Sequence, residues 1–458
     1  MKNKICLISL GCVRNLVDSE VIIGILAQNG YVIENDIASS DFIIINTCAF
    51  LKEARDEAVF TIDEVFKNKK KNAKVIITGC MADLFKKDLK NRFKDIHLFL
   101  PAFKIDHILE ALLEKTHEDK ALEKNIDIAK DLISKNNNSK KSFLETPTTP
   151  REITTPPSYA YLKIAEGCKK FCSYCLIPTI KGSLQSKPID QVKQEFINLL
   201  DKGIKEIILI AQDLGDYGKD LKIENGLEKL LKELLLIKRD FFIRLLYVYP
   251  DSITDELIEI IKSDNRILKY IDIPIQHIND EILKKMRRTT SKKQIEEIID
   301  KLKKIDDMTI RTTLMVGFPS ETNKQFEELE KFLEDKKLDR VGIFKYSREK
   351  FTKSYDLKDQ IDEKTKEKRR KKLYDLQEKI IEEKNRCLIG KKIPVFVEGY
   401  HADSDLLMIG RAFSQAPDVD PIIIINDHEK VDEFYVLYEA EITDVIEHDL
   451  IGKIVEKI

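Results

Sequence analysis

Three cysteines crowd into one short segment, at a spacing that suits a metal centre. The segment runs Glu166-Gly167-Cys168-Lys169-Lys170-Phe171-Cys172-Ser173-Tyr174-Cys175, which is a CxxxCxxC pattern. Thiolates spaced in this way can wrap an iron–sulfur cluster. A ferredoxin-type cluster or a structural zinc site would have a fourth ligand, but the next cysteine is Cys387 and the next histidine is His277. Cys168, Cys172 and Cys175, here the loop cysteines, are therefore predicted to hold three irons of a 4Fe–4S cluster and to leave the fourth open to a small molecule.

Two simpler interpretations of the loop cysteines stay open. The thiols could form a zinc site that borrows a distant ligand, or they could be buried side chains, since a free cysteine packs as a small hydrophobe. The spacing, the strand predicted before the segment and the missing fourth ligand together favour the cluster.

A second set of cysteines is spread along the N-terminal part of the chain. Cys12, Cys48 and Cys80, here the strand-end cysteines, come directly after apolar runs at 5–10, 42–45 and 75–77. Helical patterns at 17–29 and 52–66 follow two of these runs, which predicts an open, mostly parallel α/β sheet. The carboxyl ends of parallel strands line one edge, where ligands bind. A second 4Fe–4S cluster with one open iron is therefore predicted; the alternative is three independent core cysteines.

The chain is predicted to contain three domains and a linker. Residues 1–133 form the α/β domain, and residues 134–157, with an Asn-Asn-Asn-Ser run and Thr-Pro pairs, form the linker. Residues 158–387 alternate strand and helix patterns, which predicts a partial (β/α)6 barrel; the strands are 161–165, 206–211, 242–249, 270–274, 309–316 and 340–346, and a charged helix at 362–386 closes the domain. Residues 388–458 predict a small antiparallel β-barrel, with strands 393–398, 406–409, 422–425, 434–440 and 444–447.

The composition excludes several classes of protein. The chain has 458 residues, 43% hydrophobic and 34% charged, which suits a globular protein of about three domains. Its net charge of -2 gives no general attraction to nucleic acid or membrane. No apolar run approaches the ~18 residues that a membrane span needs. With no signal-peptide pattern, a cytoplasmic location is expected, where cysteines are more often metal ligands than disulfides. Cys6, inside a predicted strand, is expected in the core, and Cys387 has no assigned role.

These cysteine segments resemble those of a known family. CxxxCxxC is the fingerprint of the radical S-adenosylmethionine (SAM) enzymes, and three N-terminal segments resemble those of the radical SAM methylthiotransferases. The segments are Gly11-Cys12-Val13-Arg14-Asn15-Leu16-Val17-Asp18-Ser19-Glu20, Asn46-Thr47-Cys48-Ala49-Phe50 and Thr78-Gly79-Cys80-Met81. Members of this family combine a second cluster, a radical SAM barrel and a C-terminal TRAM domain. The resemblance covers essentially the whole chain.

The resemblance implies the cofactors and some of their contacts. Two 4Fe–4S clusters and SAM are expected; SAM chelates the open iron and is cleaved to a radical that removes hydrogen from an unactivated carbon. Tyr174 lies where the family has an aromatic residue next to the SAM adenine. Barrel sites lie at the carboxyl ends of strands, so Gln212, after the second strand, is a candidate SAM contact, as is Arg311 on the fifth, which could pair with a carboxylate. Packing inside the barrel is the alternative for Gln212 and Arg311, and no catalytic residue is assigned.

Two features favour one branch of the family, which divides by substrate. The segment that starts at Cys12 resembles the Cys-x-Lys-Asn-Leu-Val-Asp-Ser-Glu pattern of the RimO branch, with Arg14 replacing Lys, whereas the tRNA branch usually has Gln-Met-Asn. Residues 388–458 contain 15 Asp and Glu but 6 Lys and Arg, which suits a basic protein partner better than RNA. Residues 411–420 also resemble the RimO version of the TRAM domain. Lys181 and Lys187 stand where the family commonly has Arg, which has a bidentate fork that Lys lacks.

The resemblance therefore implies a RimO-type enzyme that methylthiolates the β-carbon of an aspartate in small-subunit ribosomal protein S-twelve, free or within the subunit. In the family, one SAM donates methyl, another supplies the radical, and the second cluster holds or delivers sulfur. A reductant protein such as flavodoxin or ferredoxin is expected. A tRNA adenosine methylthiotransferase is the close alternative. A non-enzymatic iron–sulfur electron carrier or redox sensor, and a structural zinc protein that binds partners through its acidic tail, are alternatives of other classes.

Overall fold

The computed structural model describes residues 3–113 and 142–458. Residues 114–141, which include the end of the predicted first domain and the start of the predicted linker, lie outside the described residues. The chain divides into two compact units. Unit 1 comprises Met1–Thr154, Lys163–Glu195 and Ser347–Tyr355, and unit 2 comprises Thr155–Leu162, Phe196–Tyr346 and Asp356–Ile458. Among the described helices, none combines the length and apolar character that crossing a membrane requires.

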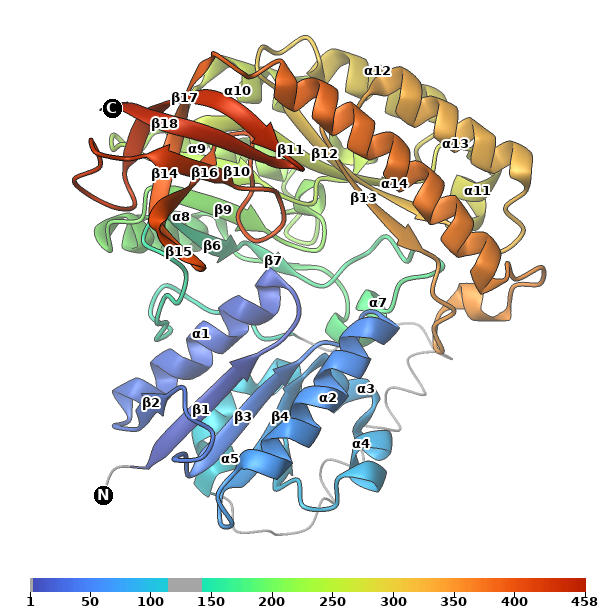
Figure 1. The fold of residues 1–458 in the computed structure, drawn as a ribbon. Helices are drawn as coiled ribbons and strands as arrows, with labels where there is room; N and C mark the ends of the chain where they lie inside the picture. Colours follow the sequence, from blue (N-terminus) through green and yellow to red (C-terminus); the bar gives the residue numbers. More distant parts are fainter. Residues whose placement is uncertain (1–2, 114–141) are drawn as a thin grey trace. The chain divides into compact units, whose positions relative to one another are not determined.

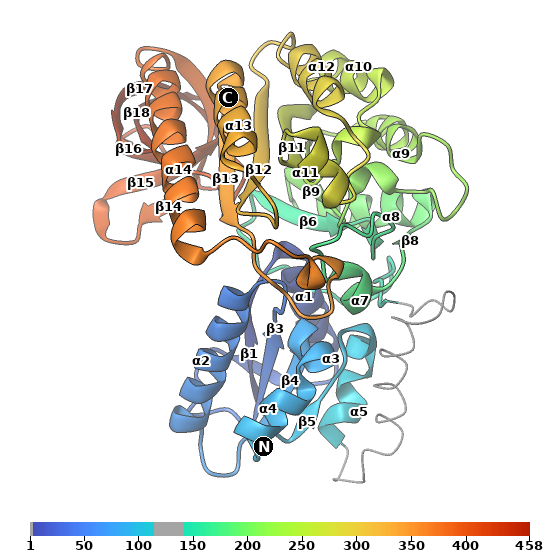
Figure 2. The same cartoon turned by 90° about the vertical axis from the view of Figure 1, so that its right-hand side faces the viewer.

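Unit 1 contains a five-stranded parallel sheet with helices on both faces (Figures 1 and 2). The strand order is β2-β1-β3-β4-β5, so the three strands that precede the strand-end cysteines are neighbours. The strands are β1 Lys4–Ser9, β2 Val32–Glu34, β3 Phe42–Thr47, β4 Lys74–Gly79 and β5 Leu98–Phe99. The helices are α1 Val13–Gln28, α2 Lys52–Asn68, α3 Cys80–Leu84, α4 Lys86–Arg92 and α5 Ile108–Leu113, with a 3-10 turn η1 Ala102–His107.

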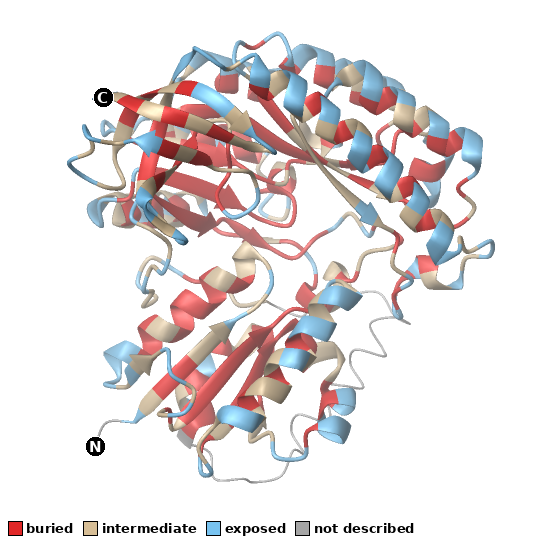
Figure 3. Cartoon of the chain, in the orientation of Figure 1, coloured by how far each residue is buried: buried red, intermediate tan, exposed pale blue. Residues whose placement is uncertain are grey.

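Alternate residues of β3 pack on opposite faces of this sheet. Ile43 and Ile45 belong to one core cluster with Ile62 of α2, whereas Ile44 belongs to another cluster with Val21 of α1. Because helices cover both faces, the central strands are apolar along their length, and Figure 3 shows them as buried. Cys6, as predicted, lies in the first cluster and is 3% exposed.

The other segments of unit 1 surround the loop cysteines. The segment Lys163–Glu195 contains a short antiparallel pair of strands and a short helix. The segment Ser347–Tyr355 ends in a 3-10 turn. The elements are β7 Ala165–Glu166, α7 Ile177–Lys181, β8 Gln185–Ser186, the start of α8 Ile189–Asp201, and η4 Lys353–Asp356. Leu176 and Ile180, at and within α7, pack in the same core cluster as Cys80 and Met81. The segment after the loop cysteines therefore packs directly against α3.

Unit 2 contains the predicted partial barrel, a sheet whose strands follow chain order, β6-β9-β10-β11-β12-β13 (Figure 1). The strands are β6 Tyr159–Lys163, β9 Glu206–Ile210, β10 Phe242–Leu245, β11 Ile267–Gln276, β12 Thr309–Val316 and β13 Arg340–Lys345. The helices are α9 Gly226–Leu235, α10 Asp255–Ser263, α11 Asp280–Lys285, α12 Lys292–Leu302, α13 Asn323–Lys336 and α14 Glu363–Arg386, with 3-10 turns η2 Leu214–Asp216 and η3 Pro250–Ser252. The predicted strand at 242–249 is too long, because Tyr247 adopts a positive φ of 65° that ends the extended run.

The last residues of unit 2 form a closed barrel of five strands, in the order β14-β15-β16-β18-β17. They are β14 Lys392–His401, β15 Ser404–Ala412, β16 Ile423–Asp427, β17 Leu437–Ile446 and β18 Asp449–Lys457. All pairs are antiparallel except β16 with β18. The separate strand predicted at 444–447 is wrong: residues 444–446 are the end of β17, where the register shifts between Ile442 and Asp444, and Glu447 lies in the turn that follows. The true fifth strand, β18, was missed.

Residues 411–420 connect this small barrel to the partial barrel within unit 2. Arg411 pairs with Glu206 of β9 at 2.6 Å. Asp418 accepts hydrogen bonds from the Tyr159 and Tyr161 hydroxyls of β6 at 3.1 and 3.2 Å, and Asp420 accepts one from Tyr270 of β11 at 2.7 Å. Two of the acidic tail residues therefore take part in hydrogen bonds within unit 2, although Asp418 itself is exposed.

Candidate functional site

The strand-end cysteines meet at the carboxyl edge of the unit 1 sheet. Cys12 follows β1 and caps the N-terminus of α1, Cys48 follows β3, and Cys80 is the first residue of α3 after β4. Gly11 has φ 92°, and a Cβ atom there would lie only 2.5 Å from the Cβ of Cys48. Only glycine fits such a close approach at positive φ. The chain therefore turns tightly so that the ends of β1 and β3 bring their cysteines together, as the sequence predicted.

Side-chain amides fix the loops that hold these cysteines. Asn15 Nδ2 donates to the carbonyl oxygens of Leu10 and Thr47, both at 3.1 Å. Asn46 Nδ2 in turn donates to the Asn15 carbonyl and to Ser19 Oγ, both at 2.9 Å. These bonds join the start of α1 to the ends of β1 and β3. They give a physical reason for the asparagines beside Cys12 and Cys48.

The chemistry of the strand-end cysteines fits a metal cluster. Burial raises the pKa of the Cys48 and Cys80 thiols, and the neighbouring thiols raise both further. Lys181 opposes this effect on Cys80. Three thiols so close together cannot all lose their protons unless a cation compensates the negative charge. Bound iron would supply that positive charge.

The loop cysteines lie in a compact turn of unit 1. Cys168 and Cys172 are buried and Cys175 is half-buried. Backbone N–H groups point at two of the sulfurs, from Lys170 to Cys168 Sγ and from Ile177 to Cys175 Sγ, both at 3.4 Å. Burial raises the pKa of Cys175 far above its ordinary value, and Cys172 and Cys168 add to the effect. Three clustered sulfurs that receive backbone N–H bonds are a donor set that suits an iron–sulfur cluster.

Among the described residues, no three His, Cys, Asp or Glu side chains are placed to share a single metal ion. A 4Fe–4S cluster does not require three side chains around a single ion, because each of its cysteines ligates a separate iron.

A buried charge network joins α1 to the segment around the loop cysteines. Asp18 Oδ1 lies 2.5 Å from Lys163 Nζ, and Asp18 Oδ2 lies 3.2 Å from Lys181 Nζ. Glu166 lies 3.4 Å from Lys163 and 3.6 Å from Lys181. Burial alone would lower the pKa of either lysine, but Asp18 and the other carboxylates outweigh it and raise both. The segments that carry the two cysteine sets are thus held together inside unit 1 by four charged side chains.

The described part of the predicted linker belongs to the same network. Glu145 is buried and lies 3.0 Å from Lys187 and 3.3 Å from Lys163. Arg151 donates two hydrogen bonds to Glu20 Oε2, at 2.9 and 2.7 Å. Residues 142–154 are therefore packed against unit 1. Local composition predicted a linker but not these ion pairs.

The candidate SAM contacts fall in different units. Tyr174 lies in unit 1 between Cys172 and Cys175, and it is half-buried. Gln212 is buried in unit 2, two residues after β9 ends. Arg311 is the third residue of β12, and its guanidinium lies 3.3 Å from Asp272 and 3.7 Å from Asp420. That pairing uses Arg311 inside unit 2, near the amino end of its strand. The SAM contacts of all three residues stay predictions.

Sequence reasoning missed Glu321, which lies after the carboxyl end of β12 beside His277. Its Oε2 accepts from the Gly317 and Phe318 N–H groups at 2.6 and 3.2 Å, and its Oε1 lies 2.9 Å from Arg369. Burial raises the pKa of Glu321 to about 7. Burial also lowers the pKa of His277 to about 3, so the imidazole is neutral. The Gly-Phe-Pro-Ser-Glu run was the available signal for Glu321.

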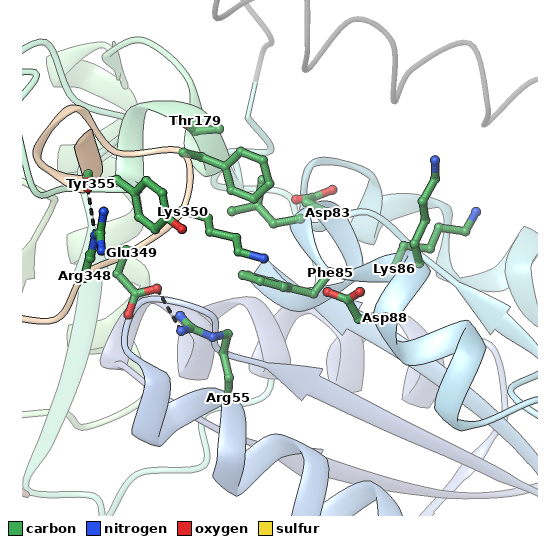
Figure 4. A pocket seen from close by; sticks show the side chains of 13 residues that line it. Arg55, Asp83, Phe85, Lys86, Asp88, Thr179, Arg348, Glu349, Lys350 and Tyr355 are labelled. Carbon is green, nitrogen blue, oxygen red and sulfur yellow. Dashed lines mark hydrogen bonds and ion pairs between the residues drawn. The ribbon is translucent and has the colours of Figure 1, made fainter.

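A cavity of about 680 Å³ lies in unit 1 beside α3 and α7 (Figure 4). Leu84, at the end of α3, and Thr179, in α7, line it, so it borders the helices that follow Cys80 and Cys175. Arg55 and Glu349 pair across it at 2.8 Å. Its lining comes from four separate segments of the chain, which is why the sequence did not predict it.

The small barrel of unit 2 carries an exposed group of carboxylates, Asp403, Asp405, Asp427 and Glu429, here the tail acidic patch. A contact of 3.3 Å between His428 Nε2 and the Leu406 carbonyl joins the residue after β16 to the start of β15. None of the four carboxylates forms an ion pair with a described residue. Leu406, between them, is 81% exposed. The patch is therefore an exposed acidic group next in sequence to an exposed apolar side chain.

Comparison with known proteins places these features in a family. Residues 4–101 match a model described as uncharacterized protein family UPF0004, residues 162–333 match the radical SAM superfamily, and residues 389–455 match the TRAM domain. The radical SAM methyltransferase TsrM from Kitasatospora setae, solved with tryptophan and a SAM analogue, is similar in fold, with a TM-score of 0.52 and 14% identity over 75% of this chain and 73% of that chain.

Full-length relatives are much closer in sequence. Proteins named ribosomal protein uS12 methylthiotransferase RimO are 49% identical in Protochlamydia amoebophila, over 99% of this chain and 93% of the relative, and 46% identical in Chlamydia felis, over 100% and 96%. The RimO of a Thermoanaerobacter species is 41% identical, over 99% and 100%. The protein is a radical SAM methylthiotransferase whose cofactors are SAM and 4Fe–4S clusters, and it belongs to the RimO family.

Proposed function

We propose that the enzyme adds a methylthio group to the β-carbon of an aspartate in ribosomal protein uS12. One observation carries this proposal: both three-cysteine sets lie in one compact unit of the chain. The chain is also 49% identical to a relative that is named for this substrate. The loop cysteines would hold the cluster that binds SAM, and the strand-end cysteines would hold a second 4Fe–4S cluster.

The residues around the cysteines position and shield the reaction. When bound, the clusters and SAM supply the radical and the sulfur chemistry. The glycine turns and the asparagine bonds fix the strand-end cysteines, and the Asp18 network fixes them relative to the loop cysteines. Burial of Cys168, Cys172, Cys48 and Cys80 excludes water, which a reactive radical requires. Tyr174 and Gln212 are proposed to contact SAM.

The tail acidic patch supports a protein substrate. An acidic surface attracts a basic protein and repels RNA phosphates, whereas an RNA-binding module needs a basic face. Relatives are named for a ribosomal protein, and ribosomal proteins are usually basic. We therefore place uS12 docking on the small barrel.

The remaining expectations follow from the same chemistry. SAM cleavage consumes an electron, so a reductant protein such as flavodoxin or ferredoxin is a proposed partner. Six free cysteines in two cluster sites suit the reducing cytoplasm. The domain bounds 1–133, 158–387 and 388–458 enclose the three family matches and stay part of the proposal.

Mass spectrometry of uS12 from cells with and without this gene tests the function. We expect one aspartate to carry the mass of a methylthio group only when the gene is present. Cells that express the triple Ala variant of the strand-end cysteines should lack the modification. Unmodified uS12 in all cells, with a gene-dependent methylthio group on tRNA adenosine, would show that the protein acts on tRNA instead.

A further inference from the structure

Three rings meet on the small barrel of unit 2, and one of them is open to a partner. Tyr400, near the end of β14, contacts His428, which follows β16, and Phe434, which precedes β17. Its ring centroid lies 6.2 Å from that of His428 and 5.6 Å from that of Phe434, and both neighbours stand nearly perpendicular to it. His428 and Phe434 are half-buried, whereas Tyr400 is 50% exposed. The tyrosine is therefore fixed by two neighbours while half of its surface remains accessible.

A β-bulge beside Tyr400 displays an apolar side chain. At this point the pairing of β14 with β15 advances by one residue on β14, from 400 to 401, but by four on β15, from 408 to 404. Residues 405–407 therefore bulge out of the ladder, and Leu406 among them is 81% exposed. Bulges at barrel rims commonly re-aim side chains. The Leu406 carbonyl lies 3.3 Å from His428 Nε2, so the bulge is joined to the same histidine that contacts Tyr400.

Carboxylates adjoin both ends of this contact in sequence. Asp405 precedes Leu406, and Asp427 and Glu429 stand on either side of His428. All three carboxylates belong to the tail acidic patch, are exposed and form no ion pair with a described residue. An accessible aromatic ring joined in this way to unpaired carboxylates suits a guanidinium, which is flat enough to stack on a ring and has N–H groups for carboxylate oxygens.

We propose that Tyr400 binds an arginine side chain of uS12, with the guanidinium stacked on the accessible part of its ring and the carboxylates of the tail acidic patch balancing the charge. The proposal rests on the proposed function, in which uS12 is the substrate. Leu406 supplies an apolar surface for the methylene stem of the same arginine. A lysine fits less well, because its ammonium is compact, strongly hydrated and unable to stack. An RNA phosphate would be repelled by the carboxylates.

The test measures binding of fluorescently labelled uS12 to the reconstituted holoenzyme by anaerobic fluorescence anisotropy. Tyr400→Leu keeps an apolar side chain but removes the ring, and it should weaken binding about 5- to 30-fold, the range for a cation–π contact that is partly shielded from water. Tyr400→Phe keeps the ring and should bind uS12 within about 3-fold of the unaltered enzyme.

A double-mutant cycle identifies the arginine. Each arginine of uS12 is replaced in turn by lysine, which keeps the charge but removes the planar guanidinium. We expect one replacement to weaken binding to the unaltered enzyme about 3- to 10-fold. The same replacement should change binding to Tyr400→Leu by less than about 1.5-fold, because two groups in contact do not act additively.

The control is Tyr374→Leu. Tyr374 is 45% exposed and lies in α14 of unit 2, outside the small barrel, so its replacement should leave uS12 affinity unchanged. Circular dichroism checks that each variant folds. If Tyr400→Leu does not fold, Tyr400→Met, which also lacks a ring but has a more adaptable side chain, takes its place.

Three outcomes would overturn the proposal. Tyr400→Leu with the affinity of the unaltered enzyme would show that the ring makes no contact with uS12. A loss in Tyr400→Leu that adds to the effect of every arginine replacement would show that Tyr400 shapes the barrel without reading a guanidinium. An unaltered enzyme that binds tRNA and ignores uS12 would refute the proposed function itself, a result that the variants are not needed to obtain.

Discussion

Asp18→Asn tests whether the buried charge network holds the segments of unit 1 together. Asn keeps the volume of Asp18 but removes the charge that Lys163 meets at 2.5 Å and Lys181 at 3.2 Å. Lys163 is fully buried and the side chain of Lys181 is 7% exposed, so neither amine can turn to water. Each keeps a longer contact with Glu166, at 3.4 and 3.6 Å, and Lys163 also keeps Glu145 at 3.3 Å, but the closest carboxylate is lost. Removing one partner from a buried ion pair costs about 3–5 kcal/mol. With an m-value of about 2–3 kcal/mol per molar urea, the unfolding midpoint should fall by about 1–2 M.

Urea titration of the anaerobic holoenzyme, followed by circular dichroism and by the visible absorbance of bound iron, measures this change. Asp63→Asn is the matched control, because Asp63 pairs with Arg92 on the surface of the same unit, and exposed pairs contribute only about 0–1 kcal/mol. Adding Lys181→Met to Asp18→Asn should recover part of the loss by removing a buried charge that keeps, among the described residues, only the 3.6 Å ion pair with Glu166. A midpoint for Asp18→Asn no lower than that of Asp63→Asn would refute the reasoning.

Three further predictions concern the clusters, the tail and pH. Replacing the loop cysteines by Ala should leave about half the iron and abolish SAM cleavage. Replacing the strand-end cysteines should abolish methylthio transfer but leave the cleavage of SAM that a strong reductant drives. Full iron retention in either variant, measured by iron and sulfide analysis, would contradict two separate cluster sites. Replacing the four carboxylates of the tail acidic patch by Lys should weaken the binding of uS12 in titrations, most strongly at low salt. SAM cleavage without substrate should be unchanged in the same variant. Undiminished binding would place the docking surface elsewhere. Burial lowers the pKa of His277 to about 3, so the contribution of the neutral imidazole to stability is complete above about pH 6.5. It is lost as pH falls toward 3, by at most about 1.4 kcal/mol per pH unit. In urea titrations between pH 4 and 7, His277→Gln should make the free energy of unfolding depend less steeply on pH, and equal slopes for the two proteins would contradict this prediction.

The strands that position the cysteines were predictable from local sequence. Parallel strands covered on both faces are continuous apolar runs, and β3 and β4 each end one residue before a cysteine. The rule that parallel strands present their carboxyl ends at one edge then brought three distant residues together. Asn15 and Asn46, whose side chains hold the cysteine loops, lie at the same edge of the sheet. The same rule therefore also locates them.

Long-range charge pairs could not be predicted in this way. The stretch that contains Glu145 and Arg151 has the composition of a linker, and nothing local shows that Lys187 and Glu20 will meet it. β18 was missed because Gly452, Lys453 and Glu456 interrupt its apolar pattern. A Cβ atom at Gly452 would lie 3.1 Å from the Glu441 carbonyl of the paired strand β17, so the glycine fits a close approach that its own apolar pattern does not reveal.

The acidic tail shows why a charge count and a charge surface differ. Asp418 and Asp420 add to the count, yet they bind Tyr159, Tyr161 and Tyr270 inside unit 2. Reversing their charge would damage the connection between the two barrels and would not test docking. The four carboxylates of the tail acidic patch are exposed and form no ion pair with a described residue, so reversing them can report on electrostatic attraction.

The Asp18 network has a consequence for chemistry rather than for stability alone. An apolar set of side chains could stabilise unit 1 as well as buried ions do. Ion pairs, however, are satisfied only when particular segments meet, because a lysine that lacks its carboxylate is a buried unpaired charge. Lys163 and Lys181 flank the loop cysteines, while Asp18 lies six residues after Cys12. A reaction that needs one substrate carbon to reach both cysteine sets depends on that register. Substitutions in the network should therefore impair methylthio transfer before they reduce iron content, because transfer requires both sets in place whereas each cluster requires only its own.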